Sequence, residues 1–181
     1  MKIISQDTFS VFLIVSLAYI ASYTLTNGFI VPLQSMLLPS YTGVISLLFL
    51  PHGIRVLAAY YYGWKAFFFL VPPTYLMWFV IVHGSGVPLH PLQPIFSVLS
   101  CIIGMKVMSK NKTGHIEKEW KLLLLGGFIG SILNGISSSF LYNNGVLTSS
   151  MFGYIFGDMS GQIILMIMLI YIFKFLRMFK Y

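Results

Sequence analysis

Apolar stretches long enough to cross a membrane follow one another along almost the whole of this chain. A transmembrane helix needs about 20 mainly apolar residues, and six such stretches fit within the 181 residues. Hydrophobic residues make up 57% of the chain and charged residues only 8%, whereas soluble domains carry about 25% charged residues. We therefore predict an all-α, polytopic membrane protein. The same composition argues against a soluble enzyme, a disordered tail or a nucleic-acid-binding module.

The six predicted helices form one integral membrane domain over residues 1–181, because no repeat, low-complexity run or linker divides the chain. Pro51 removes a backbone donor and is expected to break the second helix, and Pro72 and Pro73 lie inside the third. Residues 30–40 are apolar, hold two further prolines and are interpreted as a re-entrant or interfacial piece. The hydrophilic stretch 109–121 is predicted to be a loop. The helices are expected at about residues 8–27, 41–62, 64–82, 91–108, 122–142 and 148–173.

The distribution of Lys and Arg predicts the orientation of these helices. Short cytoplasmic loops carry an excess of positive residues. With the N-terminus inside, the three outer loops hold no Lys or Arg at all. Both termini are therefore predicted to be cytoplasmic. The residues that this orientation assigns to the inner side are Lys2, Lys65, Lys106, Lys110, Lys112, Lys118, Lys121, Lys174, Arg177 and Lys180.

Only a few charged or titratable side chains lie deep inside the predicted helices, away from their ends, where a charge costs about 2.5–3.5 kcal/mol even on insertion scales. They are His52 and Arg55 of the second helix and Asp158 of the sixth. At a rise of about 1.5 Å per residue, Arg55 lies roughly 20 Å and Asp158 roughly 12 Å below the outer boundary, which an arginine side chain can bridge. We predict a buried polar cluster in the outer half of the bilayer, with Asn134 and Gln162 as further members. Its role is open between an Arg55–Asp158 pair that locks two helices together, a ligand or ion site, and a proton relay.

Small residues repeat at a spacing of four in the last two predicted helices, a pattern that lets helix backbones approach closely. We expect these two helices to pack against each other, and a homodimer face is the alternative. The stripe on the sixth helix is Gly153, Gly157 and Gly161, and those on the fifth are Gly126, Gly130 and Asn134, and Gly127, Ser131 and Gly135.

Catalytic and metal-binding patterns are weak in this sequence. Cys101 is the only cysteine and is interpreted as a small core residue. His83, His90 and His115 are scattered without the spacing of metal ligands. No glycine loop beside a lysine is present to hold a phosphate. We therefore predict that the chain is not an enzyme and holds no metal or cofactor.

Two segments resemble the MASE-type integral membrane sensory domains of bacteria. One is LPHGIRVLAAYYYGW at positions 50–64, similar to the helix that a proline and a glycine open in that family. The other is similar to the Gly-Asp-x-x-Gly motif that opens the family's last helix. His52 and Arg55 stand where the family has small or apolar residues. The residues that match are Pro51, Gly53, Gly63, Gly157, Asp158 and Gly161.

The resemblance implies a protein of the bacterial inner membrane that senses a small ligand. We expect the ligand to bind in an outer-half cavity lined by His52, Arg55 and Asp158, and the signal to pass to a separate membrane protein chain. Two alternatives stay open. One is a structural or accessory subunit of a larger membrane complex. The other is a component of a small-solute transporter, since the six-helix outline is also similar to the substrate-binding components of energy-coupling-factor vitamin importers.

Overall fold

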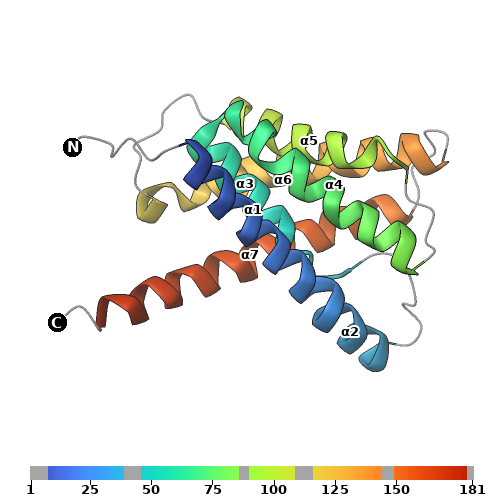
Figure 1. The fold of residues 1–181 in the computed structure, drawn as a ribbon, viewed down its shortest axis with the longest axis horizontal. Helices are drawn as coiled ribbons and strands as arrows, with labels where there is room; N and C mark the ends of the chain where they lie inside the picture. The colour runs from blue at the N-terminus through green and yellow to red at the C-terminus, as the bar shows by residue number, and fades with distance from the viewer. Residues whose placement is uncertain (1–7, 39–45, 86–89, 109–115, 144–148, 179–181) are drawn as a thin grey trace.

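The chain is helical through most of the residues that the computed structural model describes, which are 8–38, 46–85, 90–108, 116–143 and 149–178. The expected all-α fold is confirmed. Figure 1 shows the helices running back and forth along the long axis of a bundle. The elements are α1 (Thr8–Leu25), a π-helical turn η1 (Thr26–Ile30), α2 (Val31–Leu37), α3 (Leu50–Tyr62), α4 (Lys65–Ser85), α5 (Gln93–Met108), α6 (Ile116–Asn143) and α7 (Ser149–Met178).

Large apolar side chains cover the outside of the bundle, and its interior holds an apolar core together with many polar side chains. Phe68 and Phe140 are among many exposed aromatic and aliphatic residues, whereas His52 and Asp158 are buried. So large an apolar surface is unusual for a soluble monomeric protein. Among the described residues, four helical segments are long and apolar enough to cross a bilayer, and they identify the chain as a membrane protein: Thr8–Leu37, Lys65–Gly84, Glu119–Tyr142 and Met151–Met178.

The first helical run is longer than the sequence indicated. We expected a helix over 8–27 and a re-entrant or interfacial piece over 30–40. Instead α1, η1 and α2 follow one another without a break. Proline is tolerated in the first turn of a helix, which is where Pro32 lies in α2. In the π-helical turn before it, the amide of Val31 donates to the carbonyl of Thr26. This turn connects α1 to α2, so the helical run continues through the proline.

The second predicted helix is shorter than expected, and Pro51 begins it rather than breaking it. α3 starts at Leu50, with Pro51 in its first turn. At about 1.5 Å per residue, its 13 residues reach ~20 Å, less than the ~30 Å hydrocarbon core. Residues 41–45 lie outside the described residues. Residues 46–49 enter the bundle as non-helical backbone, and we call them the 46–49 segment.

α4 continues through both of its prolines. Pro73 has no N–H to donate to the carbonyl of Phe69, four residues earlier. The hydroxyl of Ser16 on α1 donates to that carbonyl at 3.4 Å instead. α4 therefore keeps its length of 21 residues, because a neighbouring helix satisfies the freed backbone group.

The connections that carry lysine gather at one end of the bundle. The ammonium of Lys106, near the end of α5, lies 5.2 Å from the ring centre of Trp64 between α3 and α4. Tyr60 donates its hydroxyl to Glu119 at the start of α6. Glu119 is buried and belongs to a helix that begins at Ile116, so the predicted loop over 109–121 ends earlier than expected. Figure 1 shows α1 beginning and α7 ending toward this same end.

The glycines of α6 serve two different contacts. A Cβ added at Gly130 would lie 3.1 Å from the Cα of Cys101, and one at Gly126 would meet Met105, both on α5. The two glycines of the first stripe, Gly126 and Gly130, therefore pack against α5 and not against α7 as expected, whereas Asn134 of the same stripe contacts Asp158 on α7. The second stripe faces α7, since a Cβ at Gly135 would lie 3.2 Å from Ile155.

The glycines of α7 accommodate the 46–49 segment rather than a helix. A Cβ at Gly157 would meet the carbonyl of Ser46, and one at Gly161 would meet the backbone of Phe49. Gly153 lies one turn earlier and is partly exposed. The close approach predicted from this stripe is present, but the approaching backbone is non-helical. A periodic glycine pattern does not encode which kind of backbone will approach it.

Candidate functional site

The most buried ionic contact joins α3 to α7. Nδ1 of His52 lies 3.2 Å from Oδ2 of Asp158, and both side chains are at most 2% exposed. The other ring nitrogen of His52, Nε2, lies 3.1 Å from the backbone carbonyl of Gly127 on α6. A carbonyl and a carboxylate are both acceptors. Each ring nitrogen of His52 therefore faces an acceptor.

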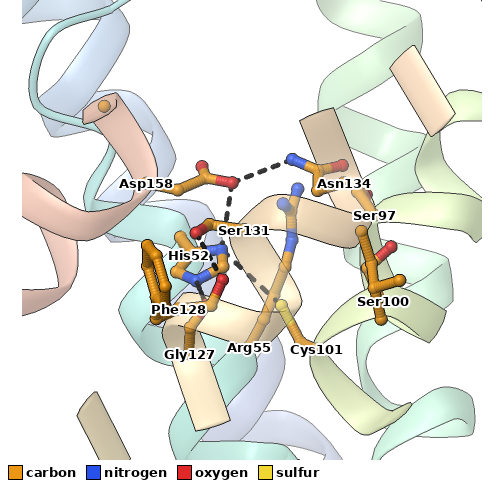
Figure 2. Close-up of polar contacts among 12 residues, drawn as sticks. His52, Arg55, Ser97, Ser100, Cys101, Gly127, Phe128, Ser131, Asn134 and Asp158 are labelled. Carbon is orange, nitrogen blue, oxygen red and sulfur yellow. Dashed lines mark hydrogen bonds and ion pairs between the residues drawn. The ribbon is translucent and has the colours of Figure 1, made fainter. Parts of the chain in front are cut away.

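Asp158 has a second partner on α6. The amide nitrogen of Asn134 donates to Oδ2 of Asp158 at 2.9 Å. Figure 2 shows these contacts converging on the carboxylate, with the side chain of Arg55 rising beside them. Hydrogen bonds from partners on two helices compensate the cost of burying this carboxylate.

Arg55, by contrast, makes its direct contacts with neutral groups among the residues that the structure describes. Its Nη2 donates to the hydroxyl of Tyr19 on α1 at 2.7 Å, and its guanidinium carbon lies 5.4 Å from the ring centres of both Tyr19 and Phe49. The side chain is 4% exposed, and Nε has no hydrogen-bond partner. The acidic side chains that the structure describes are Asp158 and Glu119, and neither forms an ion pair with Arg55. The predicted Arg55–Asp158 pair is thus replaced by a His52–Asp158 pair.

The 46–49 segment determines the position of His52 relative to α7. Its backbone bonds go to side chains and to α7: Leu47 donates to the side-chain oxygen of Gln34 at 2.8 Å, and Phe49 donates to the carbonyl of Gly157 at 2.8 Å. Ser160 donates its hydroxyl to the carbonyl of Leu47. The non-helical backbone is therefore satisfied inside the protein, as it must be within a membrane. His52, one turn into α3, is held next to α7 as a result.

The remaining predicted member, Gln162, lies beside the cluster without bonding to it. Its amide nitrogen donates to the carbonyl of Leu123 at 2.8 Å, while its oxygen has no partner. Sequence reasoning missed two contributors, Tyr19 and the backbone carbonyl of Gly127. Tyr19 stands in an apolar run like any core aromatic, and a carbonyl leaves no trace in a sequence. Cys101, interpreted as a core thiol, is fully buried and its Sγ lies 3.6 Å from Nδ1 of His52.

Comparison with models of known protein families, with curated protein sequences and with solved structures found no match for this chain. Function must therefore be argued from the cluster itself. Within the described part of the chain, no group of three or more His, Cys, Asp or Glu side chains is arranged to hold a metal ion. A groove of about 430 Å³ between α5 and α6 is lined by other residues, mainly apolar ones such as Phe96 and Leu133.

Proposed function

We propose that this protein is a membrane-embedded binding module of the sensory type, whose ligand is a small carboxylate held at Arg55. The observation that carries the proposal is the buried guanidinium of Arg55, which has neutral partners and an unpartnered Nε. Removing a charged group from water costs several kcal/mol unless an opposite charge and hydrogen bonds compensate. A bound anion supplies both at this position.

A carboxylate is the class of anion that suits this geometry. Guanidinium N–H groups form a planar fork that matches two carboxylate oxygens. An arginine carries five N–H groups, and within the described part of the chain one of those of Arg55 forms a hydrogen bond, to Tyr19. The rings of Tyr19 and Phe49 flank the guanidinium and exclude water, which strengthens the attraction to an anion.

The sensory assignment rests on the two MASE-like segments, which meet at this site. Phe49, next to the first segment, donates to the carbonyl of Gly157 in the second. Gly53 of the first would place a Cβ 3.3 Å from the backbone of Gln162 on α7. Arg55 belongs to the first segment, so a ligand bound at Arg55 would act on this junction between the two segments. We propose that the junction passes the signal to a partner chain.

The proposed location is the bacterial inner membrane, with six crossings and both termini in the cytoplasm. Lys65 begins α4, and Lys106 lies against the neighbouring Trp64, so the two lysines share one end of the bundle. This supports the orientation, because positive residues favour the cytoplasmic side. A cysteine placed at His83, in a Cys101→Ala background, should react with an impermeant thiol reagent from outside. Reaction only after permeabilisation would reverse the orientation.

Binding is tested by thermal stability in mild detergent. A ligand that binds only the folded protein raises its stability in proportion to the logarithm of ligand concentration. We expect acetate or glycolate to raise the melting temperature of the wild type, and chloride at equal ionic strength to leave it unchanged. Arg55→Gln should lose this response. Lys106→Gln, which removes a cation at the end of the bundle, should keep it.

The opposite outcome supports the structural alternative. If neither carboxylate stabilises the wild type, the cluster only fixes helix packing. The protein would then be a structural subunit of a larger membrane complex. A response in both wild type and Arg55→Gln would place the anion elsewhere on the surface.

A further inference from the structure

The hydrogen-bond pattern around His52 requires one proton more than a neutral imidazole and a carboxylate carry between them. Nε2 faces the carbonyl of Gly127 at 3.1 Å, so it holds a hydrogen. Nδ1 faces Oδ2 of Asp158 at 3.2 Å. Without a proton between these two atoms, two lone pairs would oppose each other in a buried site. Either Nδ1 or the Asp158 carboxyl therefore holds an additional proton in this arrangement.

This proton sets the charge of the whole cluster. With it, His52 and Asp158 together are neutral, and the charge of Arg55 gives the cluster a net charge of +1. Without it, Asp158 is negative and the cluster is neutral. A carboxylate bound at Arg55 reverses the preference, because the cluster is then neutral only with the proton present. Buried sites strongly favour the neutral combination, since net charge is costly where the dielectric constant is low.

On the basis of the proposed carboxylate site, we infer that the protein binds one proton at the His52–Asp158 pair together with each carboxylate bound at Arg55. The protein thus takes up the anion and the proton as an electroneutral pair. No covalent bond changes within the ligand, and the proton comes from solvent. It ends between Nδ1 of His52 and the carboxyl of Asp158.

The structure also provides for the state without this proton. The thiol of Cys101 lies 3.6 Å from Nδ1 of His52 and offers a donor when Nδ1 is unprotonated. Asn134 remains a donor to Asp158 in both states. The two states therefore differ in the partner of one ring nitrogen, so the change requires little movement of the helices.

Other titratable groups surround the pair without replacing it as the proton site. From α1, Tyr23 and Tyr19 face Arg55 rather than the pair. From α7, Tyr154 lies near Asp158 and Gln93. From α6, the contacts are a carbonyl and an amide. The titratable side chains of α4, which are Lys65, Tyr75 and His83, form no hydrogen bond or ion pair with either member of the pair.

The test is the affinity for acetate as a function of pH, measured by thermal stabilisation of the wild type in detergent between about pH 5.5 and 8.5. If binding takes up one proton, affinity falls about tenfold per pH unit once the pair has lost its proton. In Asp158→Asn, a neutral amide replaces the protonated carboxyl. We expect acetate to bind this variant with an affinity that does not depend on pH.

Each other result has a definite meaning. Acetate that binds the wild type equally well at every pH overturns the coupling and leaves the carboxylate site intact. A slope that persists in Asp158→Asn shows that neutral acetic acid binds, and it also overturns the coupling. Absence of acetate binding at every pH overturns the proposed function and this inference together. If Asp158→Asn fails to fold, proton uptake by the wild type, followed with a pH-indicator dye in weak buffer, decides between one proton and none.

Discussion

The two halves of the polar cluster differ in whether groups of the chain itself compensate the buried charge. On the side of α6 and α7, the carboxylate of Asp158 receives an ion pair from His52 and a hydrogen bond from Asn134. On the side of α1, Arg55 has a tyrosine hydroxyl, two aromatic rings and an unpartnered Nε. Both charges are almost fully buried. Burial alone therefore does not make a charge structural, because only the partners show whether its cost is compensated inside the chain.

The largest expected loss of stability lies on the side of α6 and α7, where the buried charge has its partners. Asp158→Ala leaves His52 and Asn134 without their acceptor, and breaking a buried pair costs about 3–5 kcal/mol. His52→Ala should also destabilise the protein, and the double variant should lose less than the sum of the two. The coupling energy from this double-mutant cycle, obtained by unfolding in detergent, measures the contact directly. Additive effects would show that the pair does not form.

The matched control is the double-mutant cycle between Arg55 and Asp158. Since these two residues form no ion pair, their coupling energy should be clearly smaller than that between His52 and Asp158. If Arg55 instead couples to Asp158 more strongly than His52 does, the pair that the sequence suggested is restored. That outcome would contradict the separation of the cluster into two halves.

A smaller effect is expected where the two halves are joined. The carbonyl and nitrogen of Phe49 lie against Gly161, and the Phe49 ring covers Arg55. In Gly161→Ala the new Cβ overlaps this backbone, and such overpacking costs about 1–3 kcal/mol. We expect a lower melting temperature and a weaker acetate response. Gly28→Ala is the control, because no atom lies within 4 Å of an added Cβ there, and it should leave both unchanged or raise stability slightly.

Much of this arrangement follows from the sequence, but not the choice of partners. Apolar length predicted a membrane protein, and four of the six predicted helices correspond to segments long and apolar enough to cross a bilayer within the described residues. The scarcity of intramembrane charge singled out His52, Arg55 and Asp158. Which of two basic residues three positions apart meets the acid depends on the start of α3. The sequence suggested a helix over 41–62, whereas the backbone bonds of the 46–49 segment to Gly157 and Gln34 fix its start at Leu50. Those bonds depend on tertiary contacts that local pattern does not encode.

The prolines show the same limit of prediction from local sequence. Pro51 and Pro73 present the same missing donor, but one begins a helix and the other lies inside one. The difference is in the neighbours. Ser16 donates to the carbonyl that Pro73 leaves free, whereas α7 holds the backbone before Pro51 in a non-helical form. Proline therefore marks a position where a partner is needed, and the fold decides which partner it is.

The stability of Arg55→Met in detergent without added carboxylate tests most directly whether the chain itself compensates the charge of Arg55. Replacing a buried charge that forms no ion pair by an apolar side chain of similar length removes its desolvation penalty, so the change should be neutral or stabilising. We expect a free energy of unfolding within about 1 kcal/mol of the wild type, or above it. A loss as large as that of Asp158→Ala would show that Arg55 already has its partners within the chain, and it would contradict the assignment of Arg55 as a ligand-binding group.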